Sequence, residues 1–167
     1  MAHQVYKESQ SYRGTWLMYL LLMTEIPMLI LVFIILKTSK TDPNEIAFAT
    51  AVIIGVVGLT FLLLMSIRLE SRIDEVGIHY RYVPFINKWR TIPRSKIREI
   101  QVISYSPISD FGGWGIKGNR TTKAYSIIGD KGMTIHTDEK KKIMIGTQKA
   151  GELKAFLDYW QEETSYE

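Results

Sequence analysis

Two long apolar segments dominate the first 67 residues of the chain. Residues 15–36 contain one charged residue, Glu25, and residues 46–67 contain none. Each segment has 22 residues, and a helix of that length reaches roughly 33 Å at about 1.5 Å per residue. A hydrocarbon core is about 30 Å thick. Because the linker between the segments is rich in turn residues and charges, the pattern predicts two transmembrane helices that form a hairpin.

The basic residues beside the two segments predict an orientation. Five flank the outer ends and two lie in the linker: Lys7, Arg13, Arg68, Arg72 and Arg81 against Lys37 and Lys40. Because cytoplasmic flanks are enriched in Lys and Arg, both termini are expected in the cytoplasm. The prediction is a multi-pass protein of the cell (inner or plasma) membrane, with residues 1–14 as a cytoplasmic tail and 68–167 as a cytoplasmic domain.

Glu25 is an unusual residue for a membrane segment. A charged carboxylate near the middle of a bilayer costs roughly 2.5–3.5 kcal/mol on insertion scales, so such a residue is a candidate for function. It could bind a proton or ligand, or contact another protomer. The alternative is a protonated side chain that hydrogen-bonds to Thr24, or to Thr60 or Ser66 of the second segment, and the absence of a second polar relay residue favours this alternative.

From residue 68 onward the periodicity becomes that of short strands. Alternating apolar and polar positions predict seven strands, at residues 67–74, 78–84, 85–92, 97–104, 123–128, 133–137 and 142–145. A long loop is expected over 105–122. Residues 147–163 change to a period of 3.6, with Leu153, Phe156, Leu157 and Trp160 on one helical face. Seven antiparallel strands followed by one amphipathic helix predict a barrel of the pleckstrin-homology (PH)-like type, with its open end closed by the helix.

Four sequence segments carry a resemblance that covers nearly the whole chain. They are IPRSKI at 92–97, GGWGIK at 112–117, AYSIIGDKG at 124–132 and IMIGTQK at 143–149. Together with the two apolar segments, they resemble the bacterial PH-like domain membrane proteins, and in particular an uncharacterised family with Gly-Trp-Gly-Ile-Arg and Ile-Gly-Thr-Gln-Lys-Pro signatures. Lys117 replaces the usual Arg, and Ala150-Gly151 replace the usual Pro-Glu. The resemblance implies a PH-like fold and a membrane anchor, while the role of that family is largely unassigned.

The composition offers little for catalysis. The chain has no cysteine, which excludes a disulfide scaffold, a Cys nucleophile and Cys metal ligands. His3, His79 and His136 lack the spacing of a metal site. Residues 113–118 match G-x-G-x-x-G, but neither a strand before them nor a helix after them is expected, so we reject dinucleotide binding. We expect no enzyme activity, no cofactor and no metal.

The segment around these glycines is the candidate contact surface. It combines large aromatic and basic side chains: Phe111, Trp114, Lys117, Arg120 and Lys123. Aromatic side chains suit the headgroup region and cations suit anionic lipid. The alternative is that Trp114 packs onto the barrel and the glycines let the chain turn beneath it. Residues 140–142, three consecutive lysines, form a second basic cluster on a separate hairpin.

The charge distribution supports a membrane-surface role. The net charge is +4, and all of it resides in residues 68–167. No nucleic-acid recognition motif accompanies it, so nucleic acid is not an expected partner. The sequence therefore predicts an interaction module at the cytoplasmic membrane surface that binds anionic lipid or protein. The alternative is a structural or homo-oligomeric small subunit of a larger membrane complex.

Overall fold

The computed structural model describes residues 5–38 and 42–162, so His3 and Lys40 lie outside the described residues. The chain divides into two compact units. One is helical and comprises residues 12–67. The other combines residues 5–11 with residues 68–162, so its sequence is interrupted by the whole helical unit.

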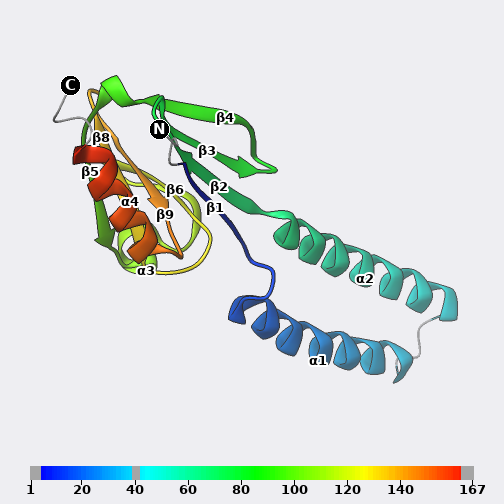
Figure 1. The fold of residues 1–167 in the computed structure, drawn as a ribbon. Helices are drawn as coiled ribbons and strands as arrows, with labels where there is room; N and C mark the ends of the chain where they lie inside the picture. The colour runs from blue at the N-terminus through cyan, green and yellow to red at the C-terminus, as the bar shows by residue number, and fades with distance from the viewer. Residues whose placement is uncertain (1–4, 39–41, 163–167) are drawn as a thin grey trace. The chain divides into compact units, whose positions relative to one another are not determined.

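The helical unit is a hairpin of two helices, α1 (Trp16–Thr38) and α2 (Pro43–Ser66). They lie side by side (Figure 1), and both are long and apolar enough to cross a membrane. The side chain of Asp42 caps α2 by accepting a hydrogen bond from the Asn44 N–H (2.7 Å), and Pro43 occupies the first turn, where its missing donor is harmless. At the opposite end of the hairpin, Arg13 Nε donates to the Met65 carbonyl oxygen (2.8 Å).

The first sheet of the other unit, sheet A, contains four antiparallel strands. In spatial order they are β1 (Tyr6–Ser11), β2 (Arg68–Ile73), β3 (Gly77–Val83) and β4 (Ile86–Pro93). Residues 6–11, expected to belong to a tail, thus form an edge strand. Ser11, at the end of β1, pairs with Arg68, at the start of β2. The helical hairpin therefore occupies the place where two adjacent strands would otherwise be joined by a turn.

The second sheet, sheet B, contains five strands. They are β5 (Ile97–Ser104), β6 (Gly115–Gly118), β7 (Thr122–Ser126), β8 (Lys131–Thr137) and β9 (Lys142–Gly146), in the spatial order β5-β8-β9-β7-β6. The short helix η1 (Arg94–Lys96) connects the two sheets in the chain, and α3 (Pro107–Phe111) follows β5. Strands β7 and β9 are parallel, whereas the other neighbours are antiparallel.

Three expectations about this unit need correction. The described residues form nine strands in two separate sheets and no closed barrel, and one strand pair is parallel, so the prediction of seven antiparallel strands was wrong. The expected loop over 105–122 contains α3 and β6. The other strands and the final helix, α4 (Ala150–Glu162), lie close to their predicted positions.

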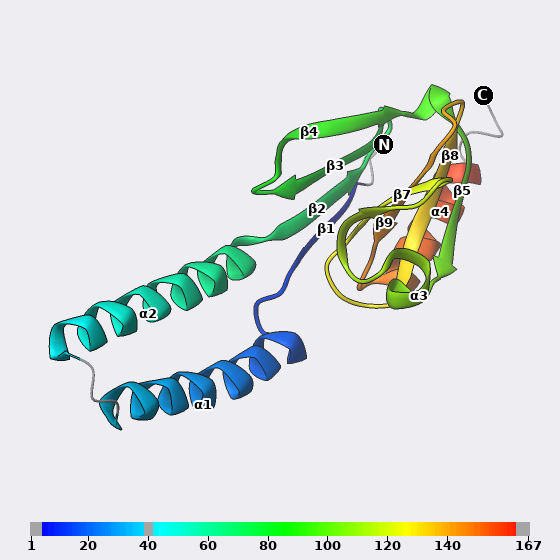
Figure 2. The ribbon, with the colours of Figure 1, turned by 180° about the vertical axis from the view of Figure 1, so that it is seen from behind.

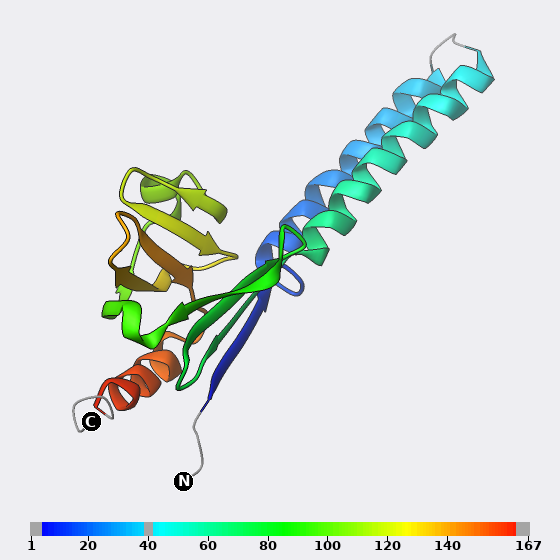
Figure 3. The same ribbon diagram turned by 90° about the horizontal axis from the view of Figure 1, so that it is seen from above.

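The two sheets face each other, and α4 lies at the opening on one side (Figure 3). Buried side chains such as Tyr80 and Tyr125, whose rings lie 5.0 Å apart, pack between the sheets. Both sheets are visible from behind in Figure 2. Leu153, Leu157 and Trp160 are the buried face of α4, as the helical period predicted. The helix contacts both sheets: the Tyr6 and Phe156 rings lie 5.7 Å apart, and Gln161 Nε2 donates to the Ile100 carbonyl oxygen (3.1 Å).

Candidate functional site

Two turns at one end of sheet B lie side by side. Lys141, in the β8–β9 turn, donates from Nζ to the Asn119 carbonyl oxygen in the β6–β7 turn (2.9 Å). The Lys142 N–H donates to the Thr121 carbonyl oxygen (2.9 Å). The parallel pairing explains this contact, because Thr122 and Lys142 begin β7 and β9 at the same register position. The two basic segments that are separate in the sequence therefore meet in the fold.

We call the cations gathered at this end of sheet B the basic turn cluster. Its members are Lys117, Arg120, Lys123, Lys140, Lys141 and Lys142. The same two segments, residues 117–123 and 138–142, contain only two carboxylates, those of Asp138 and Glu139. Asp138 is paired with Arg98 of β5. The cluster therefore has an excess of positive charge, which suits an anionic partner.

The β6–β7 turn is ordered by a side chain at its start. Asn119 Oδ1 accepts hydrogen bonds from the N–H groups of Thr121 (2.9 Å) and Thr122 (2.7 Å). This Asx-type turn fixes the backbone without using Arg120, whose side chain is exposed. Arg120 is therefore presented to solvent from a fixed backbone position.

The predicted contact lysines lie on opposite faces of the β6–β7 pair. Lys117 pairs with Ala124, which packs on the face of sheet B turned away from sheet A. Lys123 and Tyr125 are the neighbours of Ala124 in β7, so their side chains point to the opposite face of sheet B. This face is turned toward sheet A, since the Tyr125 ring lies 5.0 Å from the Tyr80 ring of sheet A. The two lysines therefore extend from opposite faces of the sheet, an arrangement that suits attraction to a diffuse anionic surface.

The two aromatic residues of the predicted contact surface pack against the domain. The Phe111 ring lies edge-on to the Tyr105 ring (5.8 Å between centroids) and packs on the buried cluster around Tyr105. Trp114 Nε1 donates to the Gly129 carbonyl oxygen (2.8 Å) and the side chain is partly buried. For Trp114, this contact agrees with the alternative in which the side chain packs onto the domain.

Polar aromatic side chains connect the sheets in the interior. Tyr82 donates to the Ser126 carbonyl oxygen (3.2 Å), and Arg90 Nη1 donates to the Tyr125 hydroxyl (3.3 Å). Burial, and then the neighbouring Tyr125, raise the pKa of Tyr80 to about 12. The Tyr80 phenol therefore stays protonated at neutral pH. The hydrogen bonds of Tyr82 and Tyr125 connect the two sheets, so we assign these side chains a structural role.

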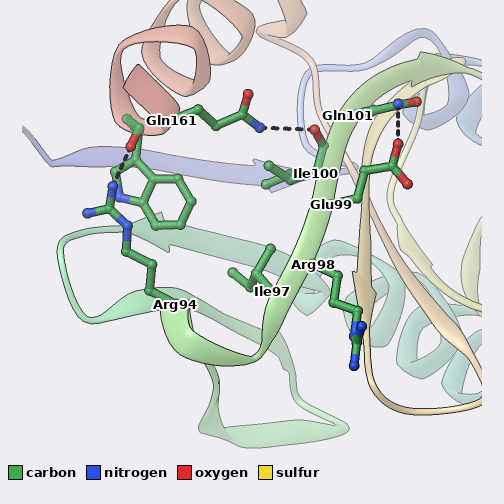
Figure 4. A pocket seen from close by; sticks show the side chains of 8 residues that line it. Arg94, Ile97, Arg98, Glu99, Ile100, Gln101 and Gln161 are labelled. Carbon is green, nitrogen blue, oxygen red and sulfur yellow. Dashed lines mark hydrogen bonds between the residues drawn. The ribbon is translucent and has the colours of Figure 1, made fainter. Parts of the chain in front are cut away.

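A groove of about 490 Å³ lies between β5, η1 and the end of α4 (Figure 4). Its two arginines are already engaged. The Arg94 guanidinium lies 4.3 Å from the Trp160 ring centroid and donates to the Trp160 carbonyl oxygen, and Arg98 pairs with Asp138. The Glu99 carboxylate also lines the groove. This groove is therefore less suited to an anion than the basic turn cluster is.

A buried carboxylate joins β1 to the corner before α4. Glu8, only 7% exposed, accepts three hydrogen bonds of 2.7 Å, from the Tyr6 hydroxyl, the Thr147 hydroxyl and the Gln148 N–H. Gln10, two residues on, donates to the Gly146 carbonyl oxygen (2.7 Å). Sequence reasoning missed this network because Glu8 and Gln10 resemble surface residues of a polar tail. The alternation of Tyr6, Glu8 and Gln10 on one face was the available signal.

Glu25 does not show the hydrogen bonds that were expected for it. The hydroxyl groups of Thr24, Thr60 and Ser66 donate to backbone carbonyls of their own helices. Glu25 Oε2 is buried and has no hydrogen-bond partner among the described residues. A ligand or protomer contact at Glu25 stays a prediction.

No group of three or more His, Cys, Asp or Glu side chains within residues 5–38 and 42–162 is arranged to hold a metal ion. Comparisons with models of known protein families, with curated proteins and with solved structures give no match for this chain. Support for a function therefore comes from the residues and their geometry.

Proposed function

We propose that this protein is a membrane-anchored interaction module whose basic turn cluster binds anionic phospholipid head groups. The observation that carries the proposal is the meeting of the β6–β7 and β8–β9 turns, which gathers six cations at one end of sheet B. Each basic residue near an anionic bilayer contributes about 1 kcal/mol. Such binding needs neither a nucleophile nor a general base, so the proposed role is not enzymatic.

Strand pairing supports a defined topology for the anchor. Strand β1 precedes α1, β2 follows α2, and the two strands pair along their whole length from Tyr6 and Ile73 to Ser11 and Arg68. Because paired strands must share a compartment, this pairing supports two crossings, which return the chain to the side from which it started. The excess of basic residues outside the linker favours the cytoplasm for that compartment.

Tethering strengthens the proposed contact. A domain fixed to the membrane meets its lipid ligand at a high effective concentration, so a weak affinity is sufficient. Two facing sheets with a C-terminal helix at their opening support a PH-like domain as the class of module. The extra strands β1 and β6 and the parallel β7–β9 pair would be additions to that fold.

The test is binding of the full chain to added vesicles. The protein is placed in phosphatidylcholine nanodiscs and mixed with vesicles of phosphatidylcholine alone or with phosphatidylglycerol. We expect cosedimentation with the anionic vesicles and weakening at high salt. Changing Arg120, Lys123 and Lys140 together to Gln should reduce the free energy of vesicle binding by about 3 kcal/mol. This corresponds to a roughly 100-fold loss of affinity.

The control removes the same charge elsewhere on the domain. Three exposed lysines lie outside the cluster: Lys7, Lys96 and Lys154. Changing all three to Gln should reduce the affinity for anionic vesicles much less than changing the three cluster residues does. Equal losses in the two variants would show a diffuse effect of net charge. Folded wild-type protein that ignores anionic vesicles would remove lipid recognition and leave a protein partner as the alternative.

A further inference from the structure

The tip of the β3–β4 hairpin exposes two large aromatic side chains. Phe85, in the turn, is 60% exposed, and Trp89, on β4, is 45% exposed. By contrast, the aromatic residues Phe111 and Trp114 of the predicted contact surface are partly buried. Exposed Phe and Trp in one hairpin form an apolar surface that favours leaving water.

The hairpin tip lies at the end of sheet A where the chain joins the helices. Arg68 follows the α2 cap residue Ile67 directly and pairs with Val83, the last residue of β3. Between β3 and β4, the last pair before the turn joins Tyr82 of β3 to Ile86 of β4. The turn that holds Phe85 is therefore one strand away from the residue at which the chain leaves α2.

The side chains around the tip have interfacial chemistry. The Arg81 guanidinium lies 4.7 Å from the Trp89 ring centroid and pairs with Glu70 of β2 (2.6 Å). Lys88 is exposed beside Trp89. Trp rings and basic side chains are both favoured at the headgroup level of a membrane, the cations by attraction to anionic lipid.

We propose that the β3–β4 hairpin tip, residues 83–89, lies in the anionic phospholipid headgroup layer of the membrane that α1 and α2 cross. The short connection from α2 to β2 keeps the tip within reach of that layer, and Phe85 and Trp89 enter it. The hairpin tip is thus a second attachment point that holds one end of sheet A at the membrane surface. The inference requires α1 and α2 to span but does not depend on the basic turn cluster.

The absence of cysteine from the sequence makes a site-specific test possible. Phe85→Cys and, as a matched control, Val76→Cys are introduced into the full chain. Val76 is 67% exposed in the β2–β3 turn, at the other end of β3. The seven residues of β3 separate the two positions by about 20 Å, more than the thickness of one headgroup layer.

Each variant is labelled with an environment-sensitive fluorophore and reconstituted into phosphatidylcholine–phosphatidylglycerol vesicles, with and without lipids that carry a quencher just below the head group. We expect blue-shifted emission and strong quenching at position 85, and neither at position 76. Thermal melting of both labelled proteins checks that each is folded.

Two outcomes would overturn the proposal: no quenching at position 85, or equal quenching at both positions, which would mean that sheet A lies flat on the bilayer. Placing Phe85→Cys in the Arg120, Lys123 and Lys140 variant separates this proposal from the first one. Quenching at position 85 should persist there even when vesicle binding through the basic turn cluster is lost.

Discussion

At the scale of single residues, Asp74 organises the β2–β3 turn. Its Oδ1 accepts hydrogen bonds from the N–H groups of Val76 (3.1 Å) and Gly77 (3.3 Å) and lies 3.0 Å from His79 Nε2. Arg72 pairs with its other oxygen (3.1 Å). Burial alone would raise the pKa of Asp74, but the hydrogen bond and charge of His79 and the backbone N–H groups outweigh it and hold the pKa below its ordinary value.

The lowered pKa of Asp74 predicts a pH dependence of stability. A depressed carboxyl pKa stabilises the folded state above the unfolded-state pKa of about 4, and that contribution disappears as the pH falls through the lowered value. Asp74→Asn should therefore lower the free energy of unfolding by about 1–2 kcal/mol near neutral pH and have little effect at strongly acidic pH. Thermal or denaturant unfolding of the full chain between neutral and acidic pH measures this.

The control for that experiment is Asp158→Asn on the exposed face of α4, which should keep the wild-type pH dependence. A constant difference between Asp74→Asn and wild type at all pH values would contradict the assignment, because it would show that the ionised form of Asp74 is not favoured by folding.

At the scale of elements, the sequence predicts strands where neighbouring residues alternate and fails where the partner is distant. The alternation of Ile78, Tyr80 and Tyr82 located β3 correctly. Strand β1 was missed because its inward positions include Glu8 and Gln10, whose burial depends on partners about 140 residues away. The parallel β7–β9 pair was missed for a similar reason, since a local pattern does not specify which strand will be the neighbour.

The same limit applied to the candidate site. Lysines and arginines could be recognised by type, and the two basic segments were identified. Their meeting depends on the pairing of β7 with β9 and could not be predicted. The identity of an aromatic residue also does not tell whether its side chain is packed or exposed. Trp114 hydrogen-bonds to the Gly129 carbonyl oxygen, whereas Phe85 is exposed.

The hydrogen bonds of Glu8 predict that β1 contributes strongly to stability. Glu8→Ala removes the acceptor of three buried or partly buried donors, and we expect the free energy of unfolding to fall by roughly 3 kcal/mol. Ser9→Ala, one residue along on the exposed face of β1, should change it by less than about 0.5 kcal/mol. Denaturant unfolding of both variants in detergent measures the difference, and similar values for the two would show that β1 does not depend on this carboxylate.

At the scale of the whole molecule, the sheet-containing unit is assembled from two separate parts of the chain. Residues 68–162 supply eight of its strands, and residues 6–11 supply the remaining edge of sheet A. Leu69 and Ile73 of β2 pair with Gln10 and Tyr6 of β1, and the Thr147 hydroxyl donates to Glu8 of β1. A fragment that begins after α2 is therefore not the complete domain.

This division predicts how a soluble form should be made. Because Ser11 pairs with Arg68, replacing residues 12–67 by a short Asn-Gly-containing turn should join β1 to β2 directly. We expect the joined chain to be monomeric and to unfold cooperatively, and residues 68–167 alone to be less stable or to aggregate through the exposed edge of β2. Size-exclusion chromatography and thermal melting compare the two chains, and equal stability would mean that β1 is dispensable.

The split sheet also bears on how the protein is made on the ribosome. Strand β1 is synthesised first, but its partner β2 emerges only after the entire segment 12–67 has been translated, a delay on the order of several seconds at typical elongation rates. If α1 and α2 cross a membrane as we propose and only one of them inserts, β1 and β2 end in different compartments and cannot pair. On the proposed topology, completion of sheet A would thus exclude integration of one helix alone, and a chain with that insertion error would remain open to proteolysis at the unpaired edge of β2.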